Sequence, residues 1–130
     1  LIAKHLSKHM KKQKSGKIVN IASIWGDKTI SKRLSYTTSK SALIGMTKTL
    51  AVELAKYNIQ VNTVSPGFTN TKLTNGILSK KQIKELVSNV PMGRMADPAE
   101  IARIVMFLCS NQNTYITGQN IIVDGGFSIT

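Results

Sequence analysis

Three short apolar runs, separated by segments long enough to form helices, constrain the fold of this chain more than any other feature. The runs are residues 17–23 (KIVNIAS), 59–64 (IQVNTV) and 118–123 (GQNIIV). Strands that alternate with helices are typical of a parallel sheet with helices on its faces. Such strands are buried on both faces and therefore form nearly continuous apolar runs. The sequence predicts an α/β domain with roughly three parallel strands and flanking helices.

The segments between the runs differ in periodicity. Residues 1–14 place apolar side chains at intervals of four, and we expect Ser15-Gly16 to end this helix, with the glycine in the left-handed conformation. A second helix is expected over residues 35–57. Residues 26–35 lack a clean period, and residues 68–76 are rich in Thr and Asn, so both segments are predicted to be loops.

Two further helices begin at recognisable caps. Ser79, with Gln82 three residues later, forms a capping box. Asp97, Pro98 and Glu100 give the same signal, with the proline in the first helical turn. Two adjacent apolar stripes follow this second cap, so most of that helix is expected to be buried. The stripes are Ile101, Val105 and Leu108, and Ala102, Met106 and Cys109.

The composition narrows the class of protein. Hydrophobic residues make up 42% of the 130 residues, which is too many for a disordered tail. The apolar run at residues 104–109 is far shorter than the ~20 residues needed to span a bilayer, which argues against a membrane protein. The single cysteine, Cys109, has no internal disulfide partner, which favours the reducing cytoplasm. No metal site is predicted.

The charge is strongly positive, at +12. Ten of the 18 basic residues lie in the first 40 positions, where Asp27 is the only acid. This excess raises nucleic-acid binding as a hypothesis. None of the aromatic residues is interleaved with the lysines, however, as a base-stacking platform requires. A solvated helix face is the favoured interpretation, because net charge bears on partners rather than on fold.

A candidate reaction centre lies at the start of the second predicted helix. Tyr36 and Lys40 are four residues apart and therefore share a helix face. An ammonium close to a phenol favours the phenolate, which makes a tyrosine a competent general acid or base near neutral pH. Ser23 ends the first predicted strand, at the edge where a doubly wound sheet binds its ligands. Taken alone, the Tyr-Lys pair also fits a helix start with a lysine lying along the surface.

Four segments together carry a family resemblance. They are residues 18–26 (IVNIASIWG), 36–42 (YTTSKSA), 61–67 (VNTVSPG) and 118–126 (GQNIIVDGG), and residues 92–102 also fit. The chain resembles the C-terminal half of a short-chain dehydrogenase/reductase, and within that family the 3-oxoacyl-acyl-carrier-protein reductases and related bacterial ketoreductases. The resemblance covers essentially the whole chain. It implies the C-terminal half of a doubly wound, Rossmann-type parallel sheet.

The resemblance implies an oxidoreductase that uses NAD or NADP and transfers hydride between the nicotinamide and a carbonyl or secondary alcohol. Tyr36 would be the catalytic acid/base, Lys40 would assist Tyr36 and bind the nicotinamide ribose, and Ser23 would polarise the carbonyl oxygen. Ser23, Tyr36 and Lys40 are thus the expected catalytic residues. The expected cofactor-binding residues are Tyr36, Lys40, Pro66, Gly67, Thr69 and Thr71.

Further expectations come from the same resemblance. Residues from 68 to about 96 would form a flap over a small-molecule substrate, although Thr69 and Thr71 also fit an ordinary role in a loop. The helices at residues 1–14 and 35–57 would pack against their copies in a homo-oligomer. Neither a membrane nor a nucleic acid is an expected partner.

One motif of the family is missing. The nine glycines never fall in the Gly-x-x-x-Gly-x-Gly spacing that lets a backbone approach a dinucleotide pyrophosphate. The residue that selects NAD or NADP is missing with it. We therefore expect residues 1–130 to be a single partial domain, inactive alone, whose first strand has an open edge. The alternative function is a non-catalytic remnant or a dimerising interaction module.

Overall fold

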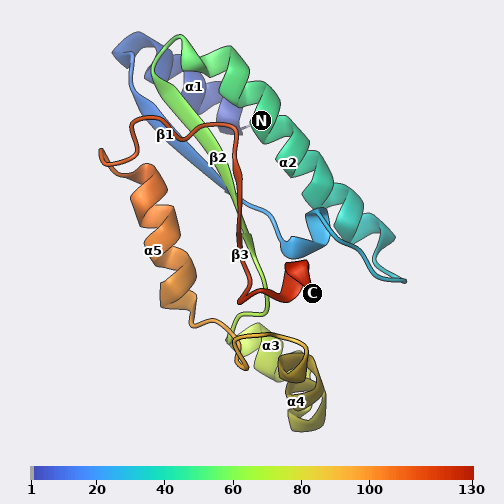
Figure 1. Cartoon of the computed structure of the whole chain (residues 1–130). Helices are drawn as coiled ribbons and strands as arrows, with labels where there is room; N and C mark the ends of the chain where they lie inside the picture. The colour runs from blue at the N-terminus through green and yellow to red at the C-terminus, as the bar shows by residue number, and fades with distance from the viewer. Residues whose placement is uncertain (1) are drawn as a thin grey trace.

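A three-stranded parallel sheet forms the centre of the molecule (Figure 1). The computed structural model describes residues 2–130, and the side chains of all of these except Ile2, Lys4 and Asn75. The strand order confirms the predicted α/β class and the three parallel strands. Because the strands are parallel, their carboxyl ends lie along one edge, which we call the carboxyl edge. The strands are β1 (Gly16–Ile21), β2 (Ile59–Pro66) and β3 (Asn120–Val123).

Two of the predicted helices cover one face of this sheet (Figure 1). α1 (Ile2–Gln13) and α2 (Leu34–Ala55) lie there, close to the predicted bounds. Leu54 of α2 is 1% exposed and packs in one apolar cluster with Ile59 of β2, and Met10 of α1 joins the cluster from the edge. This packing holds α2 in a fixed position along the sheet.

α5 (Pro98–Cys109) covers the opposite face of the sheet (Figure 1). Its side chains Ile101 and Leu108 pack against Val64 of β2. The expectation that most of this helix is buried was wrong, because its second apolar stripe faces away from the sheet. The exposed residues of that stripe are Ala102, Met106 and Cys109.

The central strand of the sheet is more deeply buried than the edge strand β1. All of β2 except Pro66 is buried, as predicted for a strand covered on both faces. β1 was expected to be buried in the same way but is only half-buried, and Ile21 at its end is 45% exposed. β1 pairs only with β2, so its other edge carries no strand among the described residues. The predicted open edge of the first strand is therefore present.

The region after β2 contains one helix that the sequence analysis missed. Residues 68–76 were predicted to be a loop, but α3 (Lys72–Ile77) begins within them. α4 (Lys80–Ser88) follows, and its predicted capping box is confirmed by reciprocal hydrogen bonds between Ser79 and Gln82. Both helices lie beyond the carboxyl edge of the sheet (Figure 1).

The turn after α1 differs from its prediction. Lys14 takes the left-handed conformation, with φ at 52°, rather than the expected Gly16. Gly16 instead starts β1, where a Cβ atom would lie 2.6 Å from the sulfur of Met10. A Cβ atom at this position would displace the Met10 side chain, so the glycine lets α1 pack closely on β1.

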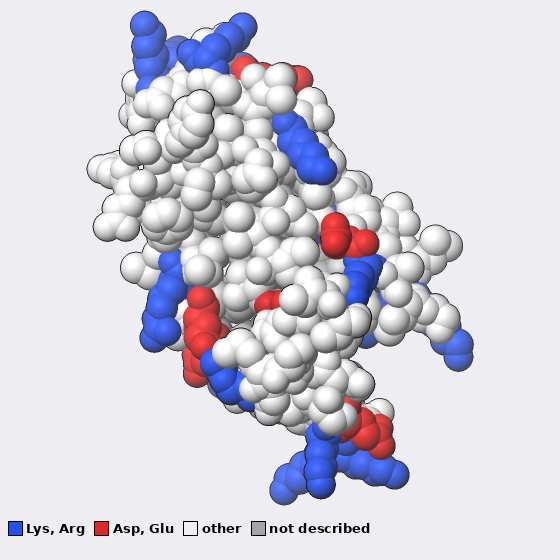
Figure 2. All heavy atoms as spheres, in the orientation of Figure 1, with Lys and Arg blue, Asp and Glu red and all other residues white. Residues whose placement is uncertain are grey.

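Charged side chains are scattered over the face seen in Figure 2. Lys and Arg project at both ends and along the sides, and wide uncharged surface separates them. No described helix is both long and apolar enough to cross a membrane. Among the described residues, His, Cys, Asp and Glu form no group of three that could hold a metal ion.

Candidate active site

The structure brings Tyr36 and Lys40 together at the start of α2. The ammonium of Lys40 lies 5.6 Å from the centre of the Tyr36 ring. The same ammonium donates a hydrogen bond to the main-chain carbonyl oxygen of Ile21, 3.1 Å away, at the end of β1. The pair therefore sits at the carboxyl edge of the sheet, with Tyr36 43% exposed and accessible to a ligand.

Ser23 lies just past the end of β1 and is 6% exposed. It caps the short helix η1 (Ile24–Gly26), and its hydroxyl oxygen accepts the amide proton of Trp25 at 3.2 Å. A Cβ atom on Gly26 would lie 3.0 Å from the carbonyl carbon of Lys40, so a glycine is required for η1 to pack this closely on α2. Glycine at this position thus brings the Ser23 turn against the part of α2 that carries Lys40.

Pro66 and Gly67 occupy the carboxyl end of β2, beside the end of β3. Pro66 lies opposite Val123, and the amide of Gly67 donates to the Val123 carbonyl at 2.9 Å. A Cβ atom on Gly67 would lie only 2.7 Å from the Cα of Asp124. The absence of a side chain here lets the two strand ends meet.

Both predicted threonines use their hydroxyl groups locally. Thr69 donates to the carbonyl oxygen of Gly67 at 3.2 Å. Thr71 caps α3 by accepting the amide proton of Thr74 at 3.1 Å. These contacts match the ordinary loop role that the sequence left open, and the role of the two threonines in cofactor binding stays a prediction.

Three aromatic rings meet at the carboxyl edge, a feature that the sequence analysis missed. The rings of Trp25, Phe68 and Phe127 pack edge to face, with centroids 4.9–6.1 Å apart. Each residue lies within four positions of the end of its own strand. Because parallel strands end at the same edge, that shared spacing was the available signal. The cluster ties together η1, the segment after β2 and the short helix η2 (Phe127–Ile129).

Arg33 is a second cation beside Tyr36 that the sequence analysis did not single out. Its guanidinium carbon lies 5.8 Å from the centre of the Tyr36 ring and 5.2 Å from the centre of the Trp25 ring. Arg33 precedes α2 directly and does not cap the helix with its side chain. The candidate acid/base therefore has a cationic group near its ring from each of Arg33 and Lys40.

Backbone hydrogen bonds join the two ends of the segment predicted to be a flap, and we call these joined ends the flap base. The amide of Ala96 donates to the Phe68 carbonyl, and the amide of Asn70 donates to the Ala96 carbonyl, both at 2.9 Å. Residues 68 and 96, the two predicted ends of the flap, are thus neighbours. α3 and α4 project from this base beyond the sheet (Figure 1).

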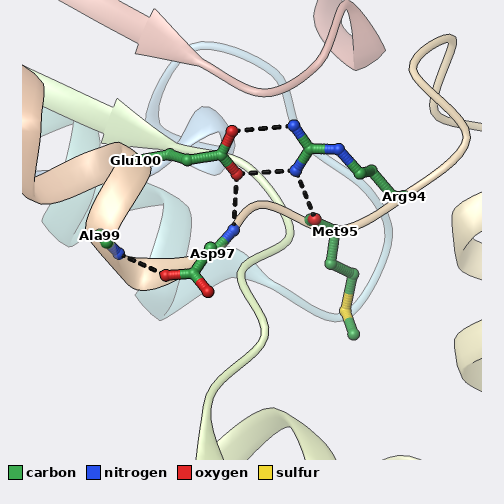
Figure 3. Close-up of polar contacts among 5 residues, drawn as sticks. All are labelled: Arg94, Met95, Asp97, Ala99 and Glu100. Atoms are coloured by element: carbon green, nitrogen blue, oxygen red, sulfur yellow. Dashed lines mark hydrogen bonds and ion pairs between the residues drawn. The ribbon is translucent and has the colours of Figure 1, made fainter.

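A bidentate ion pair between Arg94 and Glu100 connects the flap base to α5 (Figure 3). The two terminal nitrogens of Arg94 donate to the two carboxylate oxygens of Glu100, at 2.7 and 2.8 Å. Glu100 also accepts the amide proton of Asp97 at 2.8 Å, which completes the predicted capping box. The hydrogen bonds from Arg94 and from the Asp97 amide lower the pKa of Glu100 to about 2. The sequence predicted the cap but not the contribution of Arg94.

Comparison with known proteins places this chain in a family. The family model described as enoyl-(acyl carrier protein) reductase matches residues 1–128. The chain is 44% identical over 121 residues to a 3-oxoacyl-acyl-carrier-protein reductase of Thermotoga maritima, covering 93% of this chain and 49% of that protein. It is 43% identical over 126 residues to the corresponding reductase of Aquifex aeolicus, covering 97% of this chain and 50% of that protein.

Solved structures give the same result. A crystal structure of 3-oxoacyl-acyl-carrier-protein reductase from Brucella melitensis superposes with a TM-score of 0.93 at 35% identity, covering 99% of this chain and 48% of that chain. A gluconate 5-dehydrogenase from Burkholderia cenocepacia, in complex with NADP and tartrate, superposes with a TM-score of 0.90 at 29% identity, covering 99% of this chain and 51% of that chain. This chain spans about half the length of the curated relatives that it matches. The chain belongs to the short-chain dehydrogenase/reductase family.

Proposed function

We propose that this chain is the catalytic half of an NAD(P)-dependent oxidoreductase that interconverts a carbonyl compound and a secondary alcohol. The observation that carries the proposal is the Tyr36–Lys40 pair at the carboxyl edge of the sheet. The family membership and the relatives named as reductases support the same reaction type. The proposed substrate is a small-molecule carbonyl, and we place the protein in the cytoplasm because its single cysteine is free.

In the proposed reaction, Tyr36 gives its hydroxyl proton to the substrate oxygen as the carbonyl is reduced. The buried hydroxyl of Ser23 uses its oxygen to accept the Trp25 amide, so its own proton is left for donation to the same substrate oxygen. The Lys40 ammonium favours the phenolate that remains on Tyr36. When bound, the nicotinamide supplies the hydride that reaches the carbonyl carbon.

The described residues fit only the nicotinamide end of a dinucleotide. The Lys40 ammonium has three donors, of which one is used on Ile21, so donors remain for a ribose hydroxyl. Pro66 and Gly67 would border the nicotinamide, with Thr69 and Thr71 after them. No glycine turn for the pyrophosphate exists in this sequence. We therefore infer that NAD or NADP binding needs polypeptide equivalent to the uncovered half of the relatives.

Complementation tests this proposal. The chain would be co-expressed with the half of the Thermotoga maritima reductase that it does not cover, and NADPH oxidation would be followed with a panel of carbonyl substrates. We expect activity from the mixture and none from either half alone. If a stable complex forms but reduces no carbonyl compound, the proposed reaction is wrong.

A dimerising module is the second candidate function. It is favoured by apolar side chains on the two helices predicted to meet their copies: Leu6 of α1 is 50% exposed and Val52 of α2 is 81% exposed. Sedimentation of the chain alone, compared with a Val52→Lys variant, tests this surface. A wild-type chain that remains monomeric at the highest concentration examined would rule it out.

A further inference from the structure

Arg33 is held at the candidate site by aromatic contacts rather than by a carboxylate. Its guanidinium lies over the rings of Trp25 and Tyr36, at 5.2 and 5.8 Å from their centres. Trp25 is only 9% exposed and is itself fixed by Phe68 and Phe127. Cation–π contact occupies the flat face of a guanidinium and restricts its position. Arg33 therefore presents a positioned charge next to the proposed acid/base.

The hydrogen-bonding edge of this guanidinium is unused. Among the described residues, no acceptor and no carboxylate engages the N–H groups of Arg33. A guanidinium carries five N–H donors in a planar fork that matches the two oxygens of a carboxylate. Arg94 shows the contrast, because both of its terminal nitrogens donate to Glu100 and one of them also donates to the Met95 carbonyl (Figure 3). Arg33 has the same fork, but its partner would have to come from outside the described residues.

The surroundings of Arg33 favour an anion. The segment between Gly26 and Tyr36 holds Lys28, Lys32 and Arg33 but only one acid, Asp27. Residues 30–36 line a shallow surface groove that is open to solvent and includes both Arg33 and Tyr36. A small molecule in this groove would contact both Arg33 and Tyr36. An anionic group on that molecule would meet positive charge from the segment.

We propose that Arg33 binds a carboxylate of the substrate, and that the substrate class is an oxo acid and its hydroxy acid. This inference rests on the proposed function, because Tyr36 and Ser23 would hold the reacting oxygen while Arg33 holds the other end. A bidentate pair fixes both the position and the orientation of a carboxylate. Arg33 is thus a specificity-determining residue: it selects free acids over neutral esters of the same shape.

Ligand binding to the chain as it stands tests the proposal. Trp25 is the single tryptophan and lies under Arg33, so its fluorescence reports directly on this contact. Calorimetry and Trp25 fluorescence would be measured at fixed ionic strength with 2-oxo, 3-oxo and 4-oxo acids and with their methyl esters. We expect the best acid to bind ~10-fold or more tightly than its ester, as charge-assisted hydrogen bonds predict.

Two variants distinguish a specific role of Arg33 from a general effect of positive charge on acid binding. Arg33→Gln removes the fork and should abolish the preference for the acid, while Lys32→Gln removes one neighbouring charge and should retain it. Arg33→Lys, which keeps the charge without the fork, should lie between. Equal binding of acid and ester, no saturable binding of any acid, or equal losses in Arg33→Gln and Lys32→Gln would each overturn the proposal.

The complemented protein distinguishes this inference from the proposed function. If that protein reduces esters and acids equally well, the reaction stands and the role of Arg33 is wrong. If it reduces no carbonyl compound while the chain still prefers acids through Arg33, the anion site stands and the reaction is wrong.

Discussion

Lys40 donates a hydrogen bond to the carbonyl oxygen of Ile21 at 3.1 Å, and thereby joins the helix of the candidate acid/base to the end of β1. Ile21 lies on the edge strand and is 45% exposed, and among the described residues β2 is the only strand that pairs with this strand end. One lysine thus has two proposed roles: it supports the local structure, and it favours the phenolate of Tyr36.

The structural role predicts a loss of stability in the chain alone. Lys40→Met removes a charged donor to Ile21 and should lower the free energy of unfolding by about 1 kcal/mol, measured by urea denaturation. Lys48→Met is the matched control, because Lys48 lies exposed on the same helix and makes no described contact. Its effect should stay within about 0.5 kcal/mol. Equal losses in the two variants would show that the Ile21 contact contributes nothing.

The catalytic role of Tyr36 predicts a different pattern in the complemented protein. Tyr36→Phe should reduce carbonyl reduction by ~10²- to 10⁴-fold, because the group that transfers the proton is lost while the ring remains. Ser23→Ala should cost less, since it removes one donor to the substrate oxygen and leaves the acid/base. Tyr115→Phe, at a residue that is 96% exposed, is the control. Nearly full activity in Tyr36→Phe would mean that the site has been assigned to the wrong residues.

Local signals explain why much of the fold could be predicted from the sequence. The capping boxes at Ser79 and Asp97 both form as predicted, because a cap depends on residues only three positions apart. The pairing of Tyr36 with Lys40 is local in the same sense, since one helical turn sets it. The strands follow from short apolar runs, and their parallel order follows from the helices between them.

What the sequence did not predict depends on contacts between distant segments. Both stripes on α5 are apolar, and periodicity does not indicate which of them meets the sheet. The stripe that contains Met106 faces away from it, and Met106 is 70% exposed. α3 forms because Thr71 caps it, within a segment whose polar composition pointed to a loop. The contact of Trp25 with Phe68 joins segments that follow different strands, and the contact of Arg33 with Trp25 joins η1 to the start of α2, so neither can be read from a local pattern.

Replacing glycine with alanine should change the stability of the chain in opposite directions at Gly67 and Gly45. Gly67→Ala would place a Cβ atom 2.7 Å from the Asp124 backbone and force the ends of β2 and β3 apart. We expect it to destabilise the chain by about 1–3 kcal/mol. Gly45→Ala lies within α2, where a Cβ atom meets nothing within 4 Å, and should stabilise by about 0.5–1 kcal/mol. Thermal unfolding of the two variants checks the signs, and destabilisation by both would contradict this account of Gly67.

The Arg94–Glu100 fork predicts a pH dependence of stability at the flap base. The pKa of Glu100 is lowered from 4.5 to about 2, first by the Arg94 hydrogen bond and then by the Asp97 amide. A carboxylate whose folded pKa is depressed contributes stability that is fully present above its unfolded pKa and is lost as the pH falls through its folded pKa. The free-energy difference between wild type and Glu100→Gln should therefore be constant above 4.5 and shrink as the pH falls toward 2.

Both partners of this fork are at the surface, so the difference should be small and should weaken further with added salt. Urea denaturation across this pH range measures it, and an NMR titration of the Glu100 carboxyl carbon gives the folded pKa directly. Glu85→Gln is the matched control, because its carboxylate forms no ion pair among the described residues. A Glu100 titration midpoint near 4.5 would show that Arg94 does not hold this carboxylate, and that the flap base is fastened only by its backbone hydrogen bonds.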